Sequence, residues 1–184
     1  MSKSLKTIQT LSKICRILSK IVFICCIVGA VLCIIGLAGL GMGADNSVKL
    51  GGVTVYGLLQ DVEGLDTKLI CAISAQVLVF AIAEAIVAKF AEVYFKNELK
   101  AGTPFTFEGA KEMRRLGILA IALSLAAAII AGIIVTPLGA EEYQISGDVA
   151  VGTGLVLLVL SVIFKYGAEV AQSAEQKKLA DGDM

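Results

Sequence analysis

The chain has 184 residues, of which 57% are hydrophobic, and its mean hydropathy is +0.86. A soluble domain of this length is about 45–50% apolar, so the composition excludes an ordinary soluble protein and indicates a membrane protein. The formal net charge is zero, with 16 basic and 16 acidic residues, and this balance argues against direct binding of nucleic acid.

Residues 1–20 form a basic segment in which apolar residues recur every three or four positions. This pattern predicts a helix that either flanks the first span with positive charge or lies on an anionic inner leaflet, and we favour the flank. The first span is predicted over residues 21–42. Its small residues would allow a neighbouring helix to approach closely. They are Gly29, Gly36, Gly39 and Gly41.

The first loop contains β-prone residues at 48–50 and 53–56 on either side of a Gly-Gly pair. This pattern predicts a short extracellular β-hairpin. The second span is predicted over residues 68–94, and its helical pattern continues to about residue 100. Such a helix is longer than the hydrocarbon core of about 30 Å, so we expect its end to extend into the cytoplasm.

Residues 101–104, Ala-Gly-Thr-Pro, break this helix. A new helix is predicted to begin near Thr106, which would cap it, with Thr103 as the alternative cap. It leads into the third span, residues 116–135. There, small residues four apart predict one stripe that packs against another helix. They are Ala120, Ser124, Ala128 and Gly132.

The fourth span is predicted over residues 149–164, followed by a helical tail. The fold class is therefore an all-α membrane protein, a bundle of four transmembrane helices with cytoplasmic helix extensions. We divide the chain into a basic N-terminal helix (1–20), a four-span membrane domain (21–166) and a cytoplasmic C-terminal helix and tail (167–184).

The basic residues are distributed unevenly. Residues 1–20 hold five Lys or Arg, residues 88–115 hold six and the segment from Lys165 onward holds three, whereas the two remaining connections hold Lys49 and Lys68 alone. Because loops rich in Lys and Arg stay inside, we expect a multi-pass protein of the cell membrane with both termini and the middle connection in the cytoplasm.

Three polar residues are predicted within the membrane or at its edge. Glu84 lies inside the second span, and an ionisable group there is a candidate functional site. Gln76 is eight residues earlier, and two readings stay open: a polar seam with Glu84 on one side of the helix that lines a small cavity, or an interhelical hydrogen bond of Gln76. Lys165 lies at the inner end of the fourth span, where it could pair with Glu84. A structural role for Glu84 is the favoured reading, and a proton-carrying role in transport is the alternative.

The middle connection combines aromatic and basic side chains at the predicted inner surface. We expect them to anchor at lipid headgroups or to dock a cytoplasmic partner together with acidic residues of the tail. The loop residues are Phe105, Phe107, Lys111, Arg114 and Arg115, and the tail residues are Glu169 and Glu175.

Two stretches carry a resemblance to a known family. They are YFKNELKAGTPFTFEGAKEMRRLGIL (94–119) and GLVLLVLSVIFKYGAEVAQSAEQ (154–176). With the four-span layout they resemble a family of small bacterial membrane proteins, domain of unknown function 2975. The Ala/Glu-rich second span and the Lys177-Lys178 ending depart from its pattern. The resemblance implies a small helix-turn-helix regulator as cytoplasmic partner, and no catalytic residue.

No histidine, CxxC pair, phosphate-binding glycine loop or paired-carboxylate site occurs in a suitable position, so we expect no enzyme, metal site or cofactor. The leading function is a non-enzymatic bacterial membrane protein that senses or tethers a cytoplasmic partner. The alternatives are a small transporter or channel subunit that uses Glu84, which would need to form homo-oligomers, and a membrane immunity protein.

Overall fold

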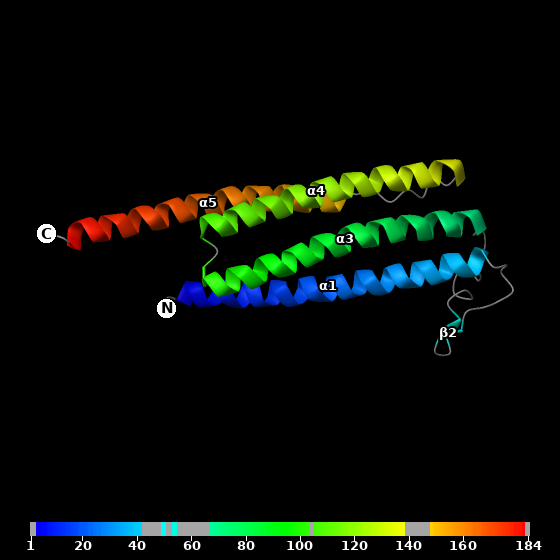
Figure 1. Ribbon diagram of the computed structural model, residues 1–184, viewed down its shortest axis with the longest axis horizontal. Helices are drawn as coiled ribbons and strands as arrows, with labels where there is room; N and C mark the ends of the chain where they lie inside the picture. Colours follow the sequence, from blue (N-terminus) through cyan, green and yellow to red (C-terminus); the bar gives the residue numbers. More distant parts are fainter. Residues whose placement is uncertain are drawn as a thin grey trace. The chain divides into compact units, whose positions relative to one another are not determined.

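Four long helices make up most of the described chain (Figure 1). The computed structural model describes residues 3–41, 49–50, 53–54, 67–103, 105–138 and 148–182. The helices are α1 (Lys3–Gly41), α3 (Thr67–Ala101), α4 (Phe107–Val135) and α5 (Asp148–Gly182). A short 3-10 helix, η1 (Thr136–Leu138), follows α4 at the predicted Thr-Pro end of the third span.

All four helices are long and apolar enough to cross a membrane. The shortest, α4, has 29 residues and the longest, α1, has 39, whereas a spanning helix needs about 20. Within the described residues, the prediction of an all-α fold with four helices able to cross a membrane is therefore confirmed. The side of the membrane on which the helix ends project stays a prediction.

Two short strands are described in the first loop. β1 (Lys49–Leu50) and β2 (Val53–Thr54) pair antiparallel, with Lys49 opposite Thr54 and Leu50 opposite Val53. The Gly-Gly pair between them and the remainder of the loop lie outside the described residues. An extracellular hairpin built on this pair therefore stays a prediction.

The chain divides into two compact units. The first unit contains Met1–Phe23, Ile86–Ala122 and Asp148–Met184, so it includes the N-terminal parts of α1 and α4, the C-terminal part of α3 and all of α5. The second unit contains Ile24–Ala85 and Leu123–Gly147.

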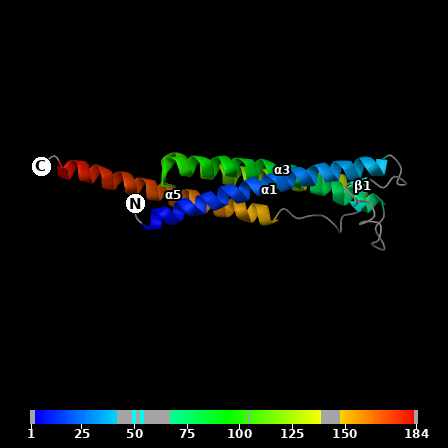
Figure 2. The same cartoon turned by 90° about the horizontal axis from the view of Figure 1, so that it is seen from below.

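In the first unit, α4 and α5 meet at two glycines. A Cβ atom on Gly117 would lie 2.9 Å from the carbonyl oxygen of Gly154, and a Cβ atom on Gly154 would lie 2.9 Å from the carbonyl oxygen of Gly117. The two backbones are thus in direct contact, as small residues permit between membrane helices. Beyond this contact, the C-terminal part of α5 extends past the N-terminal end of α1 (Figures 1 and 2).

Glycines of the first span do not provide such a contact. A Cβ atom on Gly29 or Gly36 would meet nothing within 4 Å, so the prediction of close helix approach at these two positions is wrong. Small residues permit close approach, but a neighbouring helix must also lie against them.

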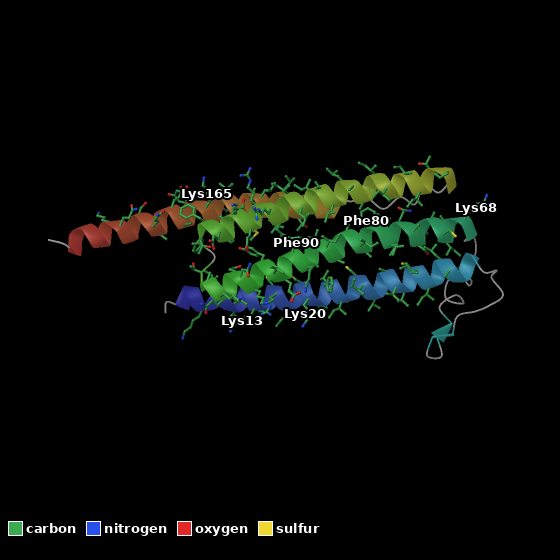
Figure 3. The ribbon with its side chains drawn as sticks, in the orientation of Figure 1. Lys13, Lys20, Lys68, Phe80, Phe90 and Lys165 are labelled. Atoms are coloured by element: carbon green, nitrogen blue, oxygen red, sulfur yellow. The ribbon has the colours of Figure 1, made fainter. Side chains whose placement is uncertain are left out.

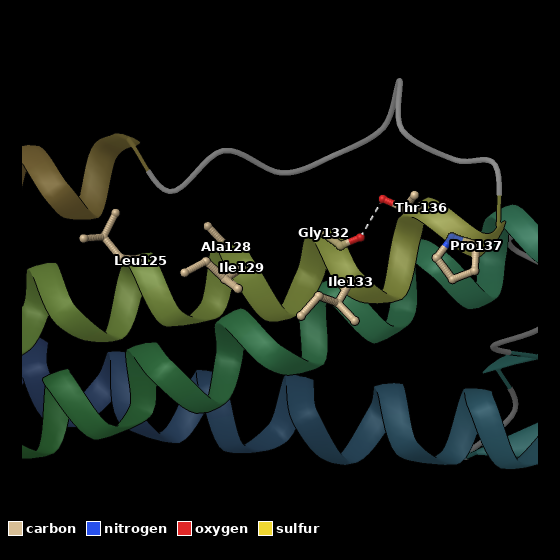
Figure 4. Close-up of a pocket in the computed structure, with 7 residues that line it drawn as sticks. All are labelled: Leu125, Ala128, Ile129, Gly132, Ile133, Thr136 and Pro137. Atoms are coloured by element: carbon tan, nitrogen blue, oxygen red, sulfur yellow. Dashed lines mark hydrogen bonds between the residues drawn. The ribbon is translucent and has the colours of Figure 1, made fainter.

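In the second unit, Ala72 and Val135 form a small buried core with Leu69 packed against it. The predicted small-residue stripe on α4 is only partly correct. Ala120 and Ser124 are buried, but burial then continues through residues 127, 131 and 135, and Ala128 and Gly132 line a shallow apolar groove (Figure 4). A strict four-residue spacing drifts around a helix of 3.6 residues per turn, so the stripe leaves the packed side.

Candidate partner-docking site

The turn between α3 and α4 has well-defined backbone geometry. Gly102 has a φ of +78°, and its N–H donates to the carbonyl oxygen of Glu98 at 3.0 Å, so a left-handed glycine ends α3. The Thr106 hydroxyl oxygen accepts a hydrogen bond from the Gly109 N–H at 2.9 Å and caps α4. Of the two predicted caps, the structure uses Thr106. Thr103 instead accepts from the Phe105 N–H at 3.3 Å, within the turn.

Helix α1 holds this turn from one side. The Gln9 side-chain amide donates to the Gly102 carbonyl oxygen at 3.2 Å, and the Ser12 hydroxyl donates to Glu98 Oε1 at 2.8 Å. Ser12 is 5% exposed, whereas Leu11 is 59% exposed and Ile17 is 60% exposed. The N-terminal part of α1 therefore packs small polar side chains on α3 and leaves large apolar side chains such as Leu11 and Ile17 exposed.

Helix α5 holds the turn through Phe105. The Phe105 ring packs edge-on against the Phe164 ring, with centroids 5.8 Å apart and planes at 86°. A Cβ atom on Gly167 would lie 2.5 Å from the Phe105 ring, so the glycine makes room for it. Phe105 thus packs against α5. It is 37% exposed, so only this part of the residue is accessible for the predicted docking of a partner.

Beyond the turn, α4 carries an exposed stripe. We define the basic stripe as Phe107, Lys111 and Arg114, three exposed residues spaced by four and three positions. This spacing places them on one side of the helix. Arg115 is also exposed, but adjacent helical positions differ by about 100°, so it lies on a different side from Arg114.

From Glu169 onward, the tail of α5 is exposed wherever its side chains are described. Lys165 is mostly exposed and forms an ion pair with Glu169 at 3.7 Å, and Figure 3 shows its position on α5. Every residue from Glu169 to Ala174 is exposed. The side chain of Glu175 lies outside the described residues. An exposed ion pair of this kind contributes little to stability, so the tail gains little from within the chain.

The predicted intramembrane polar residues lie in different surroundings. Gln76 is fully buried, whereas Glu84 is exposed on α3. The prediction of one polar seam is therefore wrong, because eight residues rotate the helix by about 80° beyond two full turns. Among the described residues Glu84 makes no hydrogen bond or ion pair, and the ion pair of Lys165 is with Glu169.

Two polar links were not predicted from the sequence. One is Ser12 to Glu98, and the other is Asn97, whose amide donates to both carboxylate oxygens of Glu112 at 3.1 and 3.3 Å. The sequence signal for the first link was Ser12 itself, because a serine within an apolar helical pattern usually forms a hydrogen bond to another helix. Within the described part of the chain, no group of three potential metal ligands gathers.

Comparison of the chain with protein-family models, with curated proteins and with solved structures finds no match. The resemblance to domain of unknown function 2975 therefore stays a prediction from residues 94–119 and 154–176.

Proposed function

We propose that the chain is a non-enzymatic bacterial integral membrane protein that senses or tethers a cytoplasmic partner through the basic stripe and the tail of α5. The observation that carries the proposal is the exposure of the tail. Glu169 to Ala174 is helical but has no buried side. A helical segment with no buried side gains little stability from packing, so contact with another molecule would stabilise it.

The basic stripe supports the same proposal. Its residues lie on α4 just after a turn that hydrogen bonds tie to α1 and that Phe105 packs onto α5. A docking surface on such a fixed turn loses little conformational entropy when it binds. The uneven distribution of Lys and Arg favours the cytoplasm for this turn and for the tail. A small helix-turn-helix regulator is the partner class that the family resemblance implies.

The proposal is tested by purifying the full chain from its native membrane in mild detergent and identifying proteins present in stoichiometric amount. We expect one small soluble DNA-binding protein. The double variant Lys111→Glu and Arg114→Glu should release it into the soluble fraction. Lys13→Glu, an exposed charge reversal on α1, is the matched control and should retain it (Figure 3). A partner that stays bound to the double variant would contradict the basic stripe as its site.

The exposure of Glu84 favours a second candidate, a transporter or channel subunit. An ionised carboxylate that faces lipid is costly, so a second copy of the chain or a water-filled path would have to surround it. Transport predicts that Glu84→Gln abolishes a proton-coupled flux in vesicles while the protein still folds. Equal flux in wild type and variant would exclude this role.

A further inference from the structure

A cleft of about 290 Å³ lies between α3 and α4 in the first unit. It is separate from the basic stripe. Three lining residues come from α3 and four from α4: Phe90, Val93, Tyr94, Glu112, Arg115, Leu116 and Leu119.

The lining of the cleft changes from apolar to charged along its length. Phe90 on α3 and Leu119 on α4 are the lining residues farthest in sequence from the turn, whereas Glu112 and Arg115 lie nearer to it. Phe90, labelled in Figure 3, is 57% exposed and Val93 is 45% exposed, and these exposed fractions indicate that the apolar part opens outward. A phospholipid has the same order of groups, with its charged headgroup at the surface and its acyl chains below.

The polar end of the cleft presents one exposed cation beside one carboxylate, Arg115 and Glu112. Arg115 is the only cation among the lining residues, and among the described side chains it forms no ion pair. Glu112 is the acidic lining residue, and both of its carboxylate oxygens accept hydrogen bonds from the Asn97 amide. The Tyr94 hydroxyl is buried and is directed to the Glu98 carboxylate, so Arg115 is the group left to bind a ligand at this end. An exposed guanidinium without an ion pair binds phosphate or carboxylate oxygens, and phosphate is the group of this kind that every phospholipid carries.

We propose that this cleft binds an anionic phospholipid of the bilayer, with one acyl chain along Phe90, Val93 and Leu119 and the phosphate at Arg115. The apolar walls supply burial of the chain, and the guanidinium selects the negative headgroup. This site does not depend on the proposed partner, because Arg114 of the basic stripe does not line the cleft.

The test is native mass spectrometry of the detergent-purified full chain after incubation with phosphatidylglycerol or phosphatidylcholine. We expect one phosphatidylglycerol retained per chain in preference to phosphatidylcholine. Arg115→Gln should reduce retention by about fivefold, the effect of one Lys or Arg near an anionic surface. Arg114→Gln removes the same charge outside the cleft and should retain the lipid as wild type does.

A second pair of variants keeps the proposal testable if Arg115→Gln does not fold. Leu119→Trp fills the apolar part without changing charge and should abolish retention. Ile118→Trp, at a 50% exposed position outside the lining, should not. Equal retention of the two lipids by wild type, equal loss in Arg114→Gln and Arg115→Gln, or full retention in Leu119→Trp would each overturn the proposal.

Discussion

The contact between Gly117 and Gly154 allows a sharp test of how α4 and α5 pack. In Gly154→Ala the new Cβ atom would lie 2.9 Å from the Gly117 carbonyl oxygen and 2.5 Å from Ile121 Cγ1. The isoleucine side chain has other rotamers, but the carbonyl oxygen belongs to the backbone of α4 and cannot move without shifting the helix. We therefore expect the helices to separate locally.

The loss of stability expected for Gly154→Ala can be estimated by comparison with a matched control variant. Replacing glycine by alanine inside a helix stabilises it by about 1 kcal/mol, while overpacking a close contact costs about 1–3 kcal/mol. Gly152 lies in the same helix, and a Cβ atom there would meet nothing within 4 Å. Gly152→Ala should therefore gain the helix stabilisation without the overpacking cost. The difference between the two variants isolates the overpacking cost and should be about 1–3 kcal/mol.

The assay is the apparent melting temperature of each detergent-purified variant, measured by size-exclusion chromatography after heating. For a chain of this size the difference corresponds to about 2–12 °C, with Gly154→Ala the less stable. Gly117→Ala should also destabilise. The double variant should be less destabilised than the two single effects added, because both methyl groups open the same contact. A Gly154→Ala protein as stable as Gly152→Ala would refute the backbone contact.

Three further predictions concern the first unit and the exposed acid. Ser12→Ala should lower stability by about 1.5–3 kcal/mol, because it removes a hydrogen bond to the Glu98 carboxylate, whereas Thr10→Ala, whose hydroxyl bonds only within α1, should have little effect in the same melting assay. Phe105→Ala should increase protease cleavage at the turn, because the ring no longer packs on Phe164, and Phe107→Ala should leave cleavage at the wild-type rate. Glu84→Gln should keep or raise the melting temperature in detergent, since the residue is exposed without a described hydrogen bond or ion pair, and a large loss would show that the carboxylate is paired.

The helices themselves could be predicted because their signals are local. Four apolar blocks long enough to span a bilayer, with Gly102 and Thr106 between the second and third, were sufficient for their number and approximate ends. α3 was expected over 68 to about 100 and runs from Thr67 to Ala101.

The contacts between helices could not be predicted in the same way. Gly29 and Gly36 have the same local signal as Gly117 and Gly154, yet only the second pair meets another backbone. Which small residue contacts a neighbouring helix depends on which helices pair and how each is rotated, and the local sequence pattern determines neither.

The candidate site could be predicted only in part, and the reason is again that contacts between helices are not local. Phe105 and Phe107 are two residues apart in a basic segment and look alike in sequence, but Phe105 packs on α5 and Phe107 is 47% exposed. Similarly, Arg114 and Arg115 were grouped as one surface, whereas only Arg115 lines the cleft against α3. Phe105 lies in the turn before α4, whereas Arg114 and Arg115 are adjacent positions of one helix and point about 100° apart, so neighbours in sequence need not act together.

The measurement that tests the account most directly is the sidedness of the turn and tail, since docking of a cytoplasmic partner requires both to face inward. Single cysteines would be introduced by Lys111→Cys, Gln172→Cys and Asp45→Cys in a chain without its native cysteines. They would then be labelled with a membrane-impermeant maleimide. We predict labelling at position 45 in intact cells and at positions 111 and 172 only after the cells are opened. Labelling of 111 or 172 in intact cells would contradict the account.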